Sequence, residues 1–166
     1  MSQAFVREPD GDAVADDQPE LPISPHPNYV TPGGLDLLKA SLADLQEQQG
    51  EIDDEALVNK LHLSQIMREI RYYEARIKQA IRVDPAAQPT GEVAFGAAVT
   101  VEDEDGNSRT YRIVGEDEAD PDQGKVSWVS PLAKALIDAR AGDLVLWERP
   151  TGAVELEIIS ISYPTT

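Results

Sequence analysis

The chain has 166 residues, enough for one small domain with an appendage, and carries 31 acidic against 14 basic side chains, a formal net charge of −17. Because phosphate binding depends on neutralisation by lysine and arginine, this charge argues against naked nucleic acid or an anionic membrane as the main partner. The sequence has no cysteine, which excludes disulfides and zinc–thiolate sites and fits a cytoplasmic location, and we see neither a secretory signal nor a membrane span.

Residues 1–30 predict a disordered acidic tail. They combine several aspartates with five prolines. Such a segment cannot bury enough apolar surface to offset the entropy of ordering it. We expect its last part, residues 23–30, to lie along the base of the helices that follow.

Residues 31–83 predict an antiparallel α-helical coiled-coil hairpin. Thr31 can cap a helix, and Pro32 suits the first helical position. In each of the two predicted helices, apolar residues recur at alternating spacings of three and four, as in the seam of a coiled coil. In an antiparallel arrangement these seams pair from Leu35 with Ala80 to Ile52 with Leu63. This register places the turn within residues 50–58.

The remainder predicts a linker over 84–90 and a sheet-rich domain over 91–163. Ser130 and Pro131 suit the cap and first position of one short helix. The predicted fold class is therefore α+β. Alternating or short apolar runs between turn signals predict six strands, over residues 93–95, 98–102, 108–114, 125–129, 143–147 and 154–163.

Several motifs of the second half resemble the transcript-cleavage factors GreA and GreB. The matching segments are residues 95–101, 111–120 and 130–143, in the family's order and spacing. The resemblance implies an FKBP-like C-terminal domain without isomerase activity. Residues 29–34 and 68–77 also resemble the family's coiled coil, although the first helical leg is shorter by about two heptads.

What the resemblance implies about function is an accessory factor of bacterial RNA polymerase, not an enzyme. Such a factor docks at the secondary channel, modulates elongation and can stimulate the polymerase to cleave backtracked RNA. Contact with nascent RNA or DNA would occur only within the polymerase complex. The resemblance further implies no membrane association, and we expect a monomer.

The tip of the hairpin carries the candidate catalytic acids Glu51, Asp53 and Asp54. Glu51 and Asp54 stand at the two acid positions of the family tip, where they would share a Mg²⁺ ion with the polymerase active site. Carboxylate oxygens suit Mg²⁺, and a second metal can stabilise attacking and leaving oxygens. The chain would have no cofactor of its own. However, the family's asparagine and acid–tyrosine pair are missing from residues 50–58, and the same acids can simply cap a solvated turn.

Two further clusters are candidate contact sites. An acidic turn followed by a helix start resembles the polymerase-docking face, where negative charge would complement a basic partner; its residues are Glu116, Asp117, Glu118, Asp120, Ser130 and Pro131. A basic stretch of the second helix resembles the family's nucleic-acid contact; its residues are Arg68, Arg71, Arg76 and Lys78. A solvated turn and a solvated helix flank are the structural alternatives for these two clusters.

The residues leave three functions open. The first is a cleavage-stimulating elongation factor. The second is a non-cleaving regulator that occupies the channel, like the Gre-related Rnk proteins with shortened arms. The third is an interaction module for a partner other than polymerase.

Overall fold

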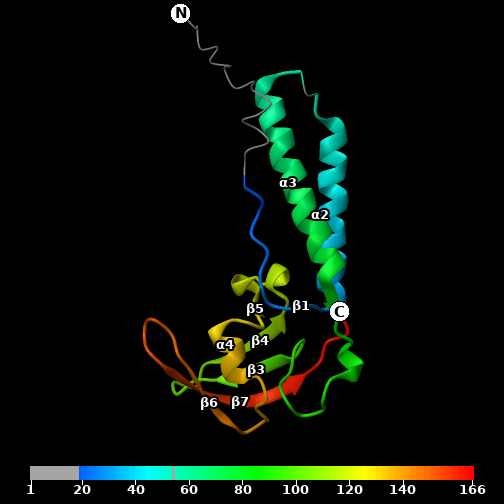
Figure 1. The fold of residues 1–166 in the computed structure, drawn as a ribbon. Helices are drawn as coiled ribbons and strands as arrows, with labels where there is room; N and C mark the ends of the chain where they lie inside the picture. The colour runs from blue at the N-terminus through cyan, green and yellow to red at the C-terminus, as the bar shows by residue number, and fades with distance from the viewer. Residues whose placement is uncertain (1–18, 54) are drawn as a thin grey trace, which may run out of the picture. The chain divides into compact units, whose positions relative to one another are not determined.

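The computed structural model describes residues 19–53 and 55–166, and these divide into two compact units (Figure 1). One unit holds residues 39–78 and the N-terminal segment up to Pro25; the other holds residues 26–38 and 79–166. Together they contain two long helices and a curled mixed sheet, so the predicted α+β class is confirmed. Among the described residues, neither long helix has the continuous apolar stretch that a membrane-spanning helix requires.

The larger unit is built on a five-stranded sheet in the order β5-β4-β3-β7-β6. β5 runs parallel to β4, whereas the other neighbouring pairs are antiparallel. The sheet is mixed because the chain reverses direction between β3 and β4 and between β6 and β7, whereas it crosses over after β4 so that β5 runs in the same direction as β4. The strands are β3 (Ala98–Glu102), β4 (Ser108–Val114), β5 (Lys125–Ser127), β6 (Leu144–Trp147) and β7 (Val154–Ser162).

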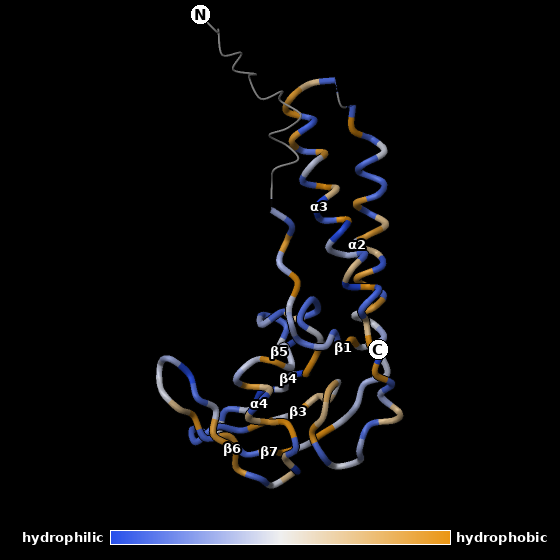
Figure 2. Tube along the Cα trace, viewed as in Figure 1, coloured by the Kyte–Doolittle hydropathy of each residue, from blue (hydrophilic) through white to orange (hydrophobic). Residues whose placement is uncertain are grey.

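Alternate residues of the strands form one side of the core. Successive side chains of a strand point to opposite faces, and alternate residues in β3, in the last part of β4 and in the middle of β7 are buried. The short helix α4 (Pro131–Leu136) covers this face with three buried residues of its own. Figure 2 colours the chain by hydropathy and shows apolar and polar stretches interspersed over the sheet. The central members are Val99, Val101, Tyr111, Ile113, Leu132, Ala133, Leu136, Leu156 and Ile158.

The smaller unit contains most of α2 (Pro32–Glu51) and α3 (Leu57–Gln79), which run antiparallel beside each other (Figure 1). Leu45, Ile66 and Ile70 form a buried cluster between them. Leu42, Ile52 and Tyr73 pack around it as half-buried neighbours. These are residues of the two seams that the heptad spacing predicts to pair.

A two-stranded parallel sheet corrects both ends of the predicted hairpin. β1 (Asn28–Val30) pairs with β2 (Ala80–Arg82), and Asn28 lies opposite Ala80. The sequence pattern predicts residues 28–30 as tail and 80–83 as hairpin, with Ala80 paired to Leu35 across two helices; the structure pairs Ala80 with Asn28 instead. The prediction missed this sheet because each strand has three residues and its partner lies about fifty residues away in the chain.

The strand predicted over residues 93–95 is wrong. Gly96 has a φ of 87°, and the amide of Ala97 donates to the carbonyl of Ala94, so the chain turns there instead of extending. Tyr163, at the other end of the domain in sequence, forms hydrogen bonds with residues 92 and 94 of this segment. Its hydroxyl donates to the carbonyl of Glu92 and accepts from the amide of Ala94, and burial raises the pKa of the phenol.

The remaining predicted elements of the larger unit agree with the structure to within two residues. β3 and β4 begin and end where the pattern predicts, while β5 stops at Ser127 instead of residue 129. The predicted linker contains a single 3₁₀ turn, Pro85–Ala87, capped by the carboxylate of Asp84.

Candidate functional site

The predicted tip lies between the two long helices. α2 ends at Glu51 and α3 begins at Leu57, so the turn falls within the predicted range. Glu51 and Asp53 are exposed, and an oxygen of Asp53 accepts from the amide of Glu55 at 3.1 Å. Asp54 lies outside the described residues. Over the ranges that the structure covers, no three acidic or histidine side chains gather as a metal site.

The acidic turn of the larger unit is a 3₁₀ helix, η2 (Glu116–Glu118), which follows β4 and packs against β5. The side chain of its last residue, Glu118, makes a contact within the larger unit. The carboxylate of Glu118 accepts a hydrogen bond from the hydroxyl of Thr31, and the same hydroxyl oxygen accepts from the amide of Gly34 at 2.9 Å. Thr31 therefore caps α2, as predicted, and a carboxylate next to a helix N-terminus is electrostatically favourable.

A glycine at the start of this turn allows the close approach of β1. A Cβ on Gly115 would lie 2.5 Å from the backbone oxygen of Tyr29, which is closer than any real Cβ contact. A Cβ on Gly34 would lie 2.5 Å from an oxygen of the Glu118 carboxylate, so that side chain would have to move. The acidic turn, β1 and the first turn of α2 thus form one packed junction within the larger unit.

The second part of the predicted docking face is the start of α4. The Ser130 side chain accepts from the amide of Ala133 at 3.3 Å, which confirms it as the helix cap, and Pro131 is exposed beside it. A shallow cavity of about 330 Å³ opens there, lined by Pro131, Lys134, Ala135, Leu146 and Glu148. Leu146 is 54% exposed. This face therefore offers an apolar contact as well as charge.

Sequence reasoning missed Leu146 and its neighbour Leu144, which is also exposed. Both lie on β6, the edge strand of the sheet, where alternate apolar residues point away from the core. The apolar run in residues 144–147 predicted a strand and did not indicate which of its side chains are exposed. The signal that could have found them is the apolar character of both faces of this strand, since the sheet buries only one of its faces in the described core.

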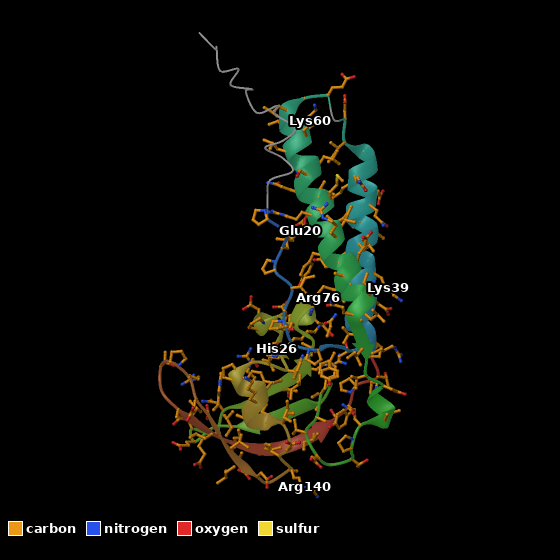
Figure 3. All side chains as sticks on the ribbon, viewed as in Figure 1. Glu20, His26, Lys39, Lys60, Arg76 and Arg140 are labelled. Carbon is orange, nitrogen blue, oxygen red and sulfur yellow. The ribbon has the colours of Figure 1, made fainter. Side chains whose placement is uncertain are left out.

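The four basic residues of α3 have different environments. Arg71 and Lys78 are exposed and Arg68 is half-buried, whereas Arg76 is 1% exposed. Figure 3 shows Arg76 on the later half of α3. The structure therefore groups Arg68, Arg71 and Lys78 as accessible residues and separates Arg76 from them.

Pro19 and Glu20, which lie within the predicted tail, contact two of these arginines. The Nε and Nη2 atoms of Arg71 donate to the carboxylate of Glu20, with a shortest distance of 2.7 Å. Nη1 of Arg68 donates to the carbonyl of Pro19 at 3.3 Å. The hydrogen bond and charge of Arg71 hold the pKa of Glu20 below its usual value, with a smaller contribution from Arg68. Figure 3 shows Glu20 beside α3.

Two aromatic groups complete the features of the larger unit. Tyr29 of β1 packs edge-on against Trp128, with ring centroids 5.1 Å apart, and also contacts Phe95. A cavity of about 450 Å³ at the far end of the sheet is lined in part by Tyr111 and Trp147. Both tryptophans, Trp128 and Trp147, are half-buried.

Comparison with known families gives one domain match. The model described as the C-terminal domain of the transcription elongation factors GreA and GreB matches residues 88–163. This range contains the acidic turn, the start of α4 and the strands of the five-stranded sheet.

Comparison with curated proteins extends the similarity beyond that domain. The chain is 39% identical over 153 residues to transcription elongation factor GreB of Neisseria meningitidis serogroup B, covering 82% of this chain and 94% of that protein. It is 49% identical over 96 residues to transcription elongation factor GreA of Alkalilimnicola ehrlichii, covering 57% of this chain and 61% of that protein.

Solved structures give weaker matches over a similar extent. GreA factor homolog 1 of Thermus thermophilus is 24% identical with a TM-score of 0.40, covering 82% of this chain and 99% of that one. A GreA/GreB elongation factor from Nitrosomonas europaea is 20% identical with a TM-score of 0.41 and the same coverage.

Proposed function

We propose that this chain, which belongs to the GreA/GreB family of transcription elongation factors, binds RNA polymerase and modulates elongation as an accessory factor. The family resemblance inferred from the motifs is confirmed by the GreB relative, whose similarity covers most of both chains. The same relative carries the proposed function, because it is named as an elongation factor and matches both the helical and the sheet-containing parts. A cytoplasmic, monomeric protein is part of this proposal.

The larger unit would provide the docking surface at the rim of the polymerase secondary channel, in an FKBP-like arrangement of sheet and helix. Support comes from the exposed Pro131 and Leu146, which line the same shallow cavity. Asp117 is exposed on the neighbouring acidic turn and would add charge complementarity. Glu118 and Ser130 contribute differently, since Ser130 caps α4 and the Glu118 carboxylate accepts from Thr31, the cap of α2.

The two long helices would form the antiparallel coiled coil that enters the channel. The support is the buried cluster of Leu45, Ile66 and Ile70, which joins the two seams. In that position the exposed Glu51 and Asp53, with Asp54, would help to hold a second Mg²⁺ ion of the polymerase active site. Arg68, Arg71 and Lys78 would contact RNA or DNA within the complex.

One observation favours a non-cleaving regulator as the second candidate. Where the family tip carries an asparagine and an acid–tyrosine pair, this chain has a run that ends in Leu57 and Val58. These two side chains are 59% and 74% exposed. Exposed apolar residues cannot ligate a metal ion, although they can fill space in a channel.

The deciding experiment uses a backtracked elongation complex. If the chain stimulates cleavage, its addition releases short 3′ RNA fragments, and the Asp53→Ala/Asp54→Ala variant releases none. The matched control is Asp44→Ala/Glu47→Ala, which removes two exposed acids from the side of α2 and leaves the tip intact. Binding without fragments from the unaltered protein would support the regulator.

Docking is tested separately by retention on immobilised polymerase. Leu146→Asp should abolish retention, because it places a charge in the proposed apolar contact. Ile159→Asp is the control, since Ile159 is also an exposed apolar strand residue and does not line the cavity. Equal retention of both variants would contradict this docking surface, and failure of the unaltered protein to bind would favour a different partner.

A further inference from the structure

The contact between Glu20 and Arg71 occupies the hydrogen-bonding edge with which an arginine binds phosphate. Arg71 presents Nε and Nη2 to the two carboxylate oxygens at 2.7 to 3.1 Å. The same planar edge pairs with two oxygens of a phosphate group, because both anions offer two acceptors at similar spacing. Glu20 therefore fills the position that a phosphodiester would take.

The contact extends over one turn of α3. Arg68 precedes Arg71 by three residues, so the two side chains lie on the same face of the helix. The neighbouring residue of the tail, Pro19, accepts from Arg68 through its carbonyl. Consecutive residues of one segment thus engage consecutive arginines of the proposed nucleic-acid face. Lys78, two turns further along, is exposed and has no described contact with this segment.

We propose that the segment around Glu20 acts as an internal competitor, which covers the arginines of α3 until a polyanion displaces it. This inference rests on the proposed role of Arg68 and Arg71 in nucleic-acid contact. It adds that the contact is regulated by the chain itself. The segment reaches α3 within a single compact unit, so the competition is intramolecular.

The exposure of the pair sets the strength of this competition. The side chains of Arg71 and Glu20 are 48% and 62% exposed. An ion pair that is this accessible to solvent is weak and easily screened. The segment can therefore lower the affinity for a polyanion severalfold without preventing binding. This strength suits a contact that must give way when RNA is held nearby at high local concentration.

The test measures binding of a fluorescein-labelled oligouridylate to the full chain by fluorescence anisotropy at low ionic strength. Glu20→Gln should tighten binding about two- to fivefold, the range expected for loss of one exposed ion pair. Glu47→Gln is the matched control. It removes the same charge from an exposed position on α2 and should leave the affinity nearly unchanged.

A double-variant cycle links the effect to Arg71. Arg71→Gln alone should weaken binding, and adding Glu20→Gln to it should produce no further change. The proposal is overturned if Glu20→Gln and Glu47→Gln have equal effects, if the gain persists without Arg71, or if no variant binds the oligonucleotide. Retention on immobilised polymerase is measured on the same proteins. If the unaltered chain is not retained, the proposed function is refuted, whereas unchanged retention of Glu20→Gln shows that the variant is folded.

Discussion

The sheet of the larger unit and the helix pair of the smaller one are stabilised to very different extents. Among the residues that the structure describes, the sheet and α4 enclose a core of twelve buried residues, whereas α2 and α3 share a cluster of three. Exposed side chains of the helix pair include the tip acids Glu51 and Asp53 and two residues of the basic stretch, Arg71 and Lys78. The comparison indicates that one unit is built for rigidity and the other for presenting side chains to a partner.

The largest test of this difference compares two buried isoleucines. Ile113→Ala in β4 should cost about 2–5 kcal/mol of unfolding free energy, because a close-packed core cannot collapse around the lost atoms. Ile66→Ala in α3 should fall at or below the low end of that range, since few buried neighbours surround it. Urea unfolding followed by circular dichroism measures both. An equal or greater cost at Ile66 would contradict the proposed difference.

The same glycine substitution should have opposite signs in the two regions. Gly115→Ala places a methyl group against the backbone of β1 and should cost about 1–3 kcal/mol. Gly50→Ala, in the last turn of α2, meets nothing within 4 Å and should stabilise by about 0.5–1 kcal/mol through helix propensity. Thermal unfolding of the two variants provides the measurement. A stabilising Gly115→Ala would mean that β1 does not approach the turn as closely as described.

A smaller effect should follow from loss of the cap on α2. Thr31→Val preserves the shape of the side chain and removes the hydroxyl that serves both the amide of Gly34 and the carboxylate of Glu118. We expect a loss of about 1–2 kcal/mol, the usual cost of removing a helix cap. Thr151→Val, at an exposed turn with no described side-chain hydrogen bond, is the control. Equal stability of the two variants would show that the junction does not depend on Thr31.

Local patterns determined most of the elements. The alternation in residues 98–102 and 108–114 predicts strands at their observed limits, and the Ser130–Pro131 start predicts α4. The seams of the two long helices identified the residues that cluster between them. These predictions succeeded because each depends on a periodicity or a cap that lies within one short stretch of chain.

The candidate site was predicted less well, because residue type does not reveal what a side chain contacts. Four basic residues of α3 read as one stretch, yet Arg76 is buried while Arg71 binds Glu20. Glu118 read as a member of an acidic surface, yet its carboxylate is bonded to Thr31. The strand over residues 143–147 was predicted, but its pattern did not reveal that Leu146 is exposed.

The sequence by itself determined the fold class, the family and the position of the turn between the long helices, since these follow from composition, spacing and motif order. Only the tertiary structure decided the pairing of β1 with β2 and the contact of the N-terminal segment with α3. Both join residues about fifty positions apart through backbone and ion-pair contacts. Such contacts leave no periodic trace in the sequence, because any extended backbone and any neighbouring carboxylate could satisfy them.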